Sequence, residues 1–192
     1  YISVEADIHL IAVPTPVNKD KSANLDFVLS AAESISSKIK NGDLVILEST
    51  SPVGTTDKIY NLIKKNNPQT KFYCCYCPER ILPGNMLNEL INNNRVIGGI
   101  DLESTEKAIE FYSSFVRSKL HKTTAKTAEL SKLTENSFRD INIAFANQLS
   151  LLCKNPQIDV NIWELISIVN DHPRVNVLSP GIGVGGHCIA VD

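Results

Sequence analysis

The stretch DLVILEST, residues 43–50, decides the fold class of this 192-residue chain. Its centre is an unbroken aliphatic run, LVIL, where a half-exposed strand would alternate apolar and polar side chains. Strands with such runs are buried on both faces, and they occur in parallel sheets that helices cover from both sides. The stretch therefore predicts an α/β protein that contains a parallel sheet.

Apolar strands and helical segments alternate on both sides of this stretch. We expect strands at residues 7–13, 43–50, 71–77, 95–99 and 119–124, and helices at 25–40, 53–65 and 103–116. This order predicts an open sheet of the Rossmann-like kind, with functional sites at the carboxyl ends of its strands. Three segments lie at such ends: VPTP, ESTSPVGT and YCPER.

The last third of the chain has a different pattern. Residues 125–154 contain neither Pro nor Gly and predict one long helix, about 45 Å at the usual rise per residue. A shorter helix is expected at 160–170. We therefore predict an α/β domain over residues 1–124 and an all-helical domain over 125–192. Because the chain starts without Met, runs at once into a strand and ends after an apolar IAV, we expect it to continue at both ends.

Composition argues against several classes of function. The chain is 43% apolar with a net charge of −2, and it has no basic cluster, so neither nucleic acid nor a membrane surface is an expected partner. We see no signal peptide and no apolar run long enough to span a bilayer. Five cysteines, three of them in CCYC, do not form a secreted disulfide framework or a zinc motif. We expect no metal and a cytoplasmic location.

The stretch GIGVGGHC, residues 181–188, has two interpretations. Gly181, Gly183 and Gly186 fit the dinucleotide fingerprint G-x-G-x-x-G, which requires a preceding strand and a following helix. Pro173 and Pro180 interrupt any preceding strand, and no helix can follow before residue 192. We therefore favour a flexible loop that presents a cysteine.

The long helix carries a polar arc. Lys132 and Asn136 are spaced i and i+4, so both can donate hydrogen bonds to one oxygen atom. Arg139, Asp140 and Asn147 share this arc, and apolar residues lie opposite. A solvated helix face opposite a core face explains the same pattern.

Four colinear segments carry a family resemblance: ESTSPVGT, CPERILPG, AELSKLTENSFRDINIAFANQLSLLC and HPRVNVLSPGIGVGGHCIAVD. Together they resemble the nucleotide-sugar 6-dehydrogenases of the UDP-glucose/GDP-mannose dehydrogenase superfamily. The resemblance implies that residues 1–124 are the second half of an NAD-binding domain, and that 125–192 are a central domain that forms a homodimer through the long helix. The family's fingerprint and its UDP-binding domain are not matched. We therefore expect this stretch alone to lack turnover.

The resemblance also implies a reaction, in which NAD⁺ twice oxidises the C6 hydroxyl of a UDP-sugar to give a carboxylate. Cys188 is then the nucleophile, which forms a thiohemiacetal and a thioester. Lys132 and Asn136 stabilise an oxyanion, and Glu79 performs acid–base work.

Further roles follow from the same resemblance. Thr50 and Asp192 lie near the catalytic lysine and the hydrolytic water, while Thr15 and Thr50 contact the nicotinamide side of NAD. The residues implied as substrate contacts are Glu79, Arg80, Lys132, Asn136, Asn147, Arg174 and Gly185.

Departures from the family pattern bear on the substrate. Pro83 replaces a second glutamate usual in UDP-glucose enzymes, and His187 precedes the cysteine; both features resemble the branch that acts on N-acetylhexosamines. Ala190 favours UDP-N-acetylmannosamine over UDP-N-acetylglucosamine. Oxidation of UDP-glucose or UDP-N-acetylglucosamine stays open, as do a β-hydroxyacid dehydrogenase of the 6-phosphogluconate type and a non-catalytic dimerisation or nucleotide-binding module.

Overall fold

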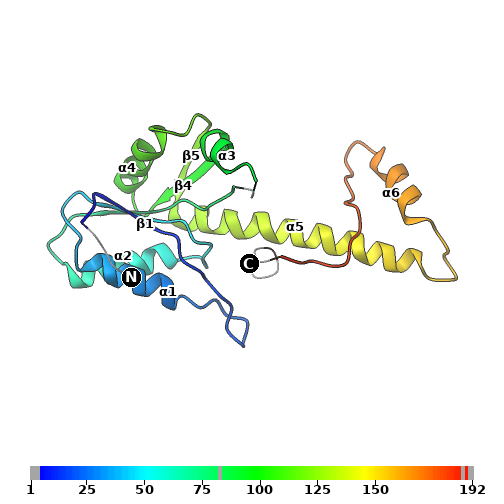
Figure 1. The fold of residues 1–192 in the computed structure, drawn as a ribbon, viewed down its shortest axis with the longest axis horizontal. Coiled ribbons are helices and arrows are strands. Elements are labelled where there is room, and N and C mark those ends of the chain that lie inside the picture. The colour runs from blue at the N-terminus through cyan, green and yellow to red at the C-terminus, as the bar shows by residue number, and fades with distance from the viewer. Residues whose placement is uncertain (1–4, 82–83, 187–188, 190–192) are drawn as a thin grey trace. The chain divides into compact units, whose positions relative to one another are not determined.

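A five-stranded sheet forms the centre of the first part of the chain (Figure 1). The computed structural model describes residues 5–81, 84–186 and 189. The strands lie side by side in chain order: β1 Ile8–Ile11, β2 Leu44–Leu47, β3 Tyr73–Tyr76, β4 Arg95–Gly99 and β5 Leu120–Thr124. The helices are α1 Asp26–Ser36, α2 Thr55–Asn66, α3 Met86–Asn92, α4 Leu102–Ser113, α5 Ala125–Cys153 and α6 Ile162–Asn170.

Strand β2 is buried along its whole length, as its aliphatic run predicts. Val45 and Leu47 pack toward α1 and α2, while Leu44 and Ile46 pack into a second cluster with Tyr112 of α4. Successive side chains of a strand point to opposite faces, so two helical layers bury the sheet from both sides. The predicted α/β Rossmann-like fold is confirmed.

One strand pairing differs from the all-parallel expectation. β1, β2 and β3 are parallel, but β4 runs antiparallel to β3, with Cys75 opposite Gly99 and Tyr76 opposite Gly98. A parallel pair needs a crossover that packs on the sheet, whereas α3, the helix between these strands, has no buried residue. Because β4 is reversed, its first residue, Arg95, lies at the edge where β2 and β3 end.

Close packing explains the glycine pair that ends β4. A Cβ atom at Gly98 would collide with the backbone carbonyl of Thr124, and one at Gly99 would meet Thr105 and Asp101. Gly98 therefore allows the turn from β5 into α5 to lie directly against β4, and Gly99 allows the first turn of α4 to do so.

The second part of the chain is helical. Two compact units are recognised, residues 1–132 and 133–192, so the first turns of α5 belong to the sheet domain. Ala128 packs in its core, and Glu129 is fully buried. The domain division at residue 124 stays a prediction. Within the described ranges, every helix is too short or too polar to cross a bilayer.

Candidate active site

The carboxyl ends of β1 and β2 are tied together by hydroxyl groups. The Ser49 hydroxyl accepts a hydrogen bond from the Val13 amide at 2.8 Å and donates one to the Val13 carbonyl at 2.7 Å. The Thr15 hydroxyl donates to the Thr50 carbonyl at 2.8 Å. The structure therefore brings together Thr15 and Thr50, the two predicted cofactor contacts, at the edge where ligands bind in open α/β sheets.

The N-terminus of α2, beside this edge, is closed by a buried carboxylate. Glu129 of α5 accepts hydrogen bonds from the Gly54 amide at 2.6 Å, the Thr56 amide at 2.8 Å and the Thr56 hydroxyl at 2.7 Å. The N-cap residue, Gly54, has a φ of 92° and no side chain to cap the helix. Glu129 supplies that cap from a distant part of the chain.

This cap limits how a dinucleotide can fit. Free amides at a helix N-terminus hold phosphate groups, but those of α2 already bind Glu129. The pyrophosphate of a dinucleotide therefore has no place at α2. At the strand ends, Thr15 and Thr50 offer hydroxyl and carbonyl groups, which are the types of group that hydrogen-bond a carboxamide, and their contact with nicotinamide stays a prediction.

We expect Glu129→Ala to lower the free energy of unfolding by about 3 kcal/mol. The substitution leaves buried amides without a partner, and hydrogen bonds to a charged group contribute ~1.5–3 kcal/mol each. Glu129→Gln keeps one acceptor oxygen and should lose less. Chemical denaturation followed by circular dichroism measures both changes.

The control for this experiment is Glu106→Ala. Glu106 lies on α4 and pairs with Lys122, and both side chains are about half exposed. Removing an exposed ion pair changes stability by about 0.5 kcal/mol. Equal effects of Glu106→Ala and Glu129→Ala would show that Glu129 is not a structural cap.

Glu79 follows β3, and its carboxylate is bound by backbone amides of the same loop. Its Oε1 atom accepts hydrogen bonds from the Arg80 and Ile81 amides, both at 2.6 Å. The Arg80 guanidinium donates to the Asn94 carbonyl at 3.2 Å, so the loop is also tied to the start of β4. The carboxylate of Glu79 is 44% exposed and can reach a bound molecule.

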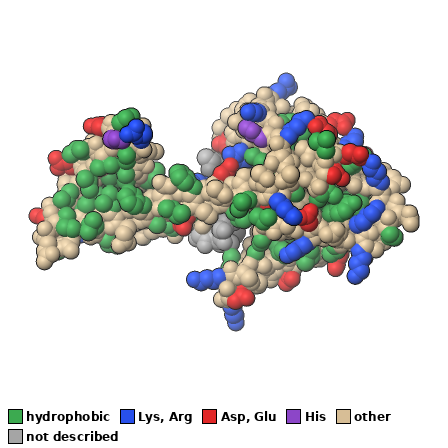
Figure 2. Space-filling model, turned by 180° about the vertical axis from the view of Figure 1, so that it is seen from behind, with side chains coloured by type: hydrophobic (Ala, Val, Ile, Leu, Met, Phe, Trp, Pro, Cys, Tyr) green, Lys and Arg blue, Asp and Glu red, His purple; other side chains and the backbone are tan. Residues whose placement is uncertain are grey.

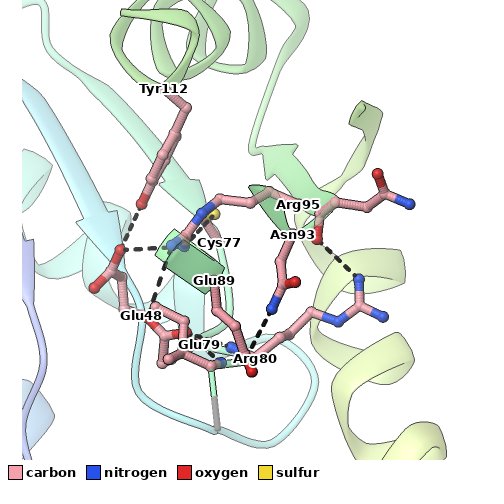
Figure 3. Close-up of polar contacts among 10 residues, drawn as sticks. Glu48, Cys77, Glu79, Arg80, Glu89, Asn93, Arg95 and Tyr112 are labelled. Atoms are coloured by element: carbon pink, nitrogen blue, oxygen red, sulfur yellow. Dashed lines mark hydrogen bonds and ion pairs between the residues drawn. The ribbon is translucent and has the colours of Figure 1, made fainter. Parts of the chain in front are cut away.

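Behind Glu79 lies a buried polar cluster (Figure 3). The Tyr112 hydroxyl donates to Glu48 at 2.6 Å, and Arg95 Nη1 lies 4.0 Å from the same carboxylate. Burial raises the pKa of Glu48 above the 4.5 usual for glutamate, because lost hydration outweighs the Tyr112 hydrogen bond and the Arg95 charge. Burial also raises the pKa of Cys77 to about 11, so this thiol stays neutral.

The raised pKa of Glu48 predicts a pH-dependent stability difference from Glu48→Gln. Between pH 4.5 and the raised pKa, the folded state binds more protons than the unfolded state. This contribution to stability is complete below pH 4.5 and is lost as pH rises through the folded-state pKa. Glu48→Gln should therefore gain stability relative to wild type as pH rises, by ~1.4 kcal/mol per unit of pKa displacement. Unfolding free energies at several pH values test this, and a flat difference would contradict it.

Lys132 and Asn136 lie one turn apart on α5. Lys132 is half-buried, and Asn136 is 5% exposed. Their i and i+4 spacing on one helix is as the sequence predicts. Their joint role on one oxygen atom stays a prediction.

The glycine loop is held by a predicted substrate contact. The Asn147 side-chain oxygen accepts a hydrogen bond from the Gly181 amide at 2.7 Å. The predicted substrate contacts Arg174 and Gly185 are exposed. Cys188 and Asp192 lie outside the described residues. Asn147 therefore has a defined contact to the chain that leads to Cys188.

Four polar residues of the site were not predicted from the sequence: Glu48, Arg95, Tyr112 and Glu129. Each is a polar residue inside a strand or helix pattern, and its partners are distant along the chain. One signal was available for Glu129, since α2 begins with Gly-Thr-Thr and lacks a local capping side chain. Cys74, Cys75 and Cys77 of CCYC are buried and free.

Comparison with known proteins gives the family. The model of the UDP-glucose/GDP-mannose dehydrogenase family, NAD binding domain, matches residues 2–116, and that of the central domain matches 126–192. UDP-N-acetyl-D-mannosamine dehydrogenase of Campylobacter jejuni is 51% identical over 98% of this chain and 48% of its own length. NDP-N-acetyl-D-galactosaminuronic acid dehydrogenase of Ralstonia nicotianae is 51% identical over 97% of this chain and 46% of its own length.

A solved structure agrees with these matches. The UDP-N-acetyl-mannosamine dehydrogenase of Staphylococcus aureus has a TM-score of 0.89 and 44% identity, covering 98% of this chain and 46% of that chain. This chain spans about half the length of the curated relatives that it matches. The resemblance drawn from the motifs is confirmed, and the chain belongs to the UDP-glucose/GDP-mannose dehydrogenase family.

Proposed function

We propose that the protein containing this chain oxidises the C6 hydroxyl of UDP-N-acetyl-D-mannosamine to a carboxylate, with NAD⁺ as the oxidant. The observation that carries the proposal is likeness to proteins named for that activity: a curated relative is 51% identical over 98% of this chain, and three solved structures are 41–44% identical. Both parts of the chain support the proposal, since family models match the sheet domain and the helical domain alike.

The chemistry needs four electrons to leave one carbon atom. The C6 alcohol first loses a hydride and a proton and becomes an aldehyde, to which the Cys188 thiolate adds as a nucleophile. The resulting thiohemiacetal loses a second hydride and a proton and becomes a thioester. Water then attacks the thioester, so that the carboxylate forms and the Cys188 thiol leaves. NAD⁺, when bound, accepts the hydrides.

The residues of this chain have separate tasks in that sequence. Lys132 and Asn136 donate hydrogen bonds to the oxygen on C6 wherever it carries negative charge. Glu79 moves protons to and from the attacking water, with Asp192 and Thr50 beside that water. The chain offers Thr15 and Thr50 to the nicotinamide end of the cofactor, and this assignment is supported by their hydrogen bond at the strand ends.

Substrate contacts are assigned to the same surfaces. The proposed contacts are Glu79, Arg80, Lys132, Asn136, Arg174 and Gly185, with Asn147 holding the glycine loop. The relative named for an N-acetylgalactosaminuronic acid has the same 51% identity as that named for N-acetylmannosamine. The choice of N-acetylmannosamine therefore rests on the solved structures: those named for it are 41–44% identical, and the one named for N-acetyl-D-galactosaminuronic acid is 32% identical.

A substrate panel tests the proposed function. The full-length protein is incubated with NAD⁺ and with the UDP derivatives of N-acetylmannosamine, N-acetylgalactosamine, N-acetylglucosamine or glucose. We expect the highest kcat/KM with UDP-N-acetylmannosamine. Higher kcat/KM with another sugar would reassign the substrate, and no NADH with any sugar would refute the dehydrogenase function.

We also propose a homodimer that forms through α5. In the helical unit, large apolar side chains on α5 are exposed: Phe138, Ile141, Phe145, Leu151 and Leu152. Figure 2 shows hydrophobic side chains gathered over this unit, and a hollow of about 380 Å³ is lined by Phe145, Leu149 and Leu152 among others. Apolar surface of this extent is typical of an interface, and twofold pairing is the commonest arrangement.

The dimer proposal predicts the effect of a charge on this face. Ile141 is 66% exposed, so Ile141→Glu should leave the fold intact but weaken the dimer by at least tenfold in Kd. Arg139→Glu, on the opposite side of α5, is the control. Sedimentation velocity measures both, and a wild-type monomer at high micromolar concentration would contradict the proposal.

We propose the cytoplasm as the compartment. Cys74, Cys75, Cys77 and Cys153 carry free thiols, which persist in a reducing environment.

A further inference from the structure

We propose that Arg95 is a positioning residue for Glu79: the Arg95 guanidinium, anchored by Glu48, fixes the direction in which the Glu79 carboxylate faces. This inference rests on the proposed function, in which Glu79 moves protons during thioester hydrolysis. Arg95 itself is buried, with 4% of its side chain exposed, so it acts through Glu79 and not on the substrate.

The sheet topology brings the two residues together. β3 and β4 pair antiparallel, with Cys75 opposite Gly99 and Tyr76 opposite Gly98. Continued past the end of β3, this register places Glu79 opposite Arg95. A parallel β4 would have put its first residue at the other edge of the sheet.

The guanidinium lies between two carboxylates (Figure 3). Arg95 Nη2 is 3.9 Å from Glu79 Oε2, and Nη1 is 4.0 Å from Glu48 Oε1. Both distances exceed those of hydrogen bonds, so the attraction is electrostatic, and partial burial makes it stronger than at an open surface. Arg95 Nε is buried without a hydrogen-bond partner among the described residues. Nε therefore keeps unused donor capacity, while Nη1 also donates to Cys77 Sγ at 4.0 Å.

Glu48 and Tyr112 hold Arg95 from the other side. The Tyr112 hydroxyl donates to Glu48 at 2.6 Å, and the Arg95 guanidinium carbon lies 5.1 Å from the centre of the Tyr112 ring. Tyr112 is 1% exposed and packs in the core beneath α4. The position of Arg95 is thus set by rigid neighbours and does not depend on Glu79.

The two oxygens of Glu79 are held by different parts of the protein. Oε1 accepts from the Arg80 and Ile81 amides of its own loop. Oε2 faces Arg95 on a neighbouring strand. The backbone of the loop is tied to its surroundings by Arg80 and by the Glu79 amide, and the contact with Arg95 ties the carboxylate itself to the sheet.

A double-mutant cycle in the full-length protein tests the inference. Arg95→Lys keeps the charge but loses the planar fork, and it is made in wild type and in the Glu79→Gln background. Single-turnover carboxylate formation from UDP-N-acetylmannosamine is measured with enzyme in excess, so that slow variants give a rate. We expect Arg95→Lys to slow wild type by about 10–100-fold, since small displacements of a catalytic group have effects of this size. The enzyme concentration that gives half of the maximal rate should stay nearly unchanged. In the Glu79→Gln background, Arg95→Lys should change the rate less than twofold.

Controls separate positioning from general damage. Arg117→Lys, at an exposed arginine, should have no effect. Tyr112→Phe keeps the ring but removes the hydroxyl that fixes Glu48, and should slow wild type less than Arg95→Lys does. Circular dichroism confirms that each variant is folded.

The possible outcomes point to different parts of the account. The same slowing by Arg95→Lys in both backgrounds would overturn the inference and leave the role of Glu79 intact. A normal rate in Glu79→Gln alone would overturn both the role of Glu79 and the inference. In either case carboxylate formation by the wild-type protein would still support the dehydrogenase function.

Discussion

Cys188→Ala in the full-length protein is expected to reduce carboxylate formation by several orders of magnitude. Without the thiolate, the aldehyde has no covalent trap, and the second oxidation has no thiohemiacetal to act on. The first oxidation should persist. Chromatography of the sugar products, together with NADH absorbance, measures both steps.

Two further cysteine variants sharpen this result. Cys188→Ser should be nearly as damaging but should accumulate a slow ester that intact-protein mass spectrometry can detect, because an alkoxide leaves less readily than a thiolate. Cys153→Ala, at a buried cysteine on α5, is the control and should keep activity. Near-normal carboxylate production by Cys188→Ala would rule out the covalent route.

Lys132→Ala is expected to slow both oxidations by about 10²–10³, the usual effect of removing one donor to an oxyanion. The effect should fall on kcat more than on KM, because the hydrogen bond is strongest when the oxygen on C6 carries negative charge. Presteady-state NADH formation resolves the two steps. An effect on only one step would contradict a role for Lys132 in both.

Lys126→Ala is the matched control for Lys132→Ala. Lys126 lies on the first turns of the same helix and pairs with Asp57 at 3.4 Å, with 67% of its side chain exposed. Its loss removes a lysine from α5 without removing a proposed catalytic donor. A comparable slowing by both variants would mean that the effect arises from the helix and not from Lys132.

Sequence patterns predicted most elements of this fold because burial controls them. The aliphatic run of β2 predicts a buried strand from local sequence alone. The absence of Pro and Gly from α5 predicts a long helix in the same way. α3 was missed although Met86, Leu87, Leu90 and Ile91 recur at helical spacing, because the segment is only seven residues long. β4 runs in the reverse direction because the short connection before it does not cross over a face of the sheet. A single sequence does not reveal this.

Some residues of the candidate site could be predicted from the sequence, and others could not. Residues in motifs, such as Glu79 and Lys132, were found through the family resemblance. Arg95 and Glu129 were not, because their partners are remote: Glu79 and Glu48 for Arg95, and Gly54 and Thr56 for Glu129. Only the fold brings these groups together.

The number of NADH molecules formed per sugar consumed tests the central claim most directly. Limiting UDP-N-acetylmannosamine is oxidised to completion by the full-length protein with excess NAD⁺, and NADH and sugar are both quantified. Two successive hydride transfers from one carbon predict a ratio of two. A ratio of one, with a carbonyl product and no carboxylate, would contradict the account and indicate a simple alcohol dehydrogenase.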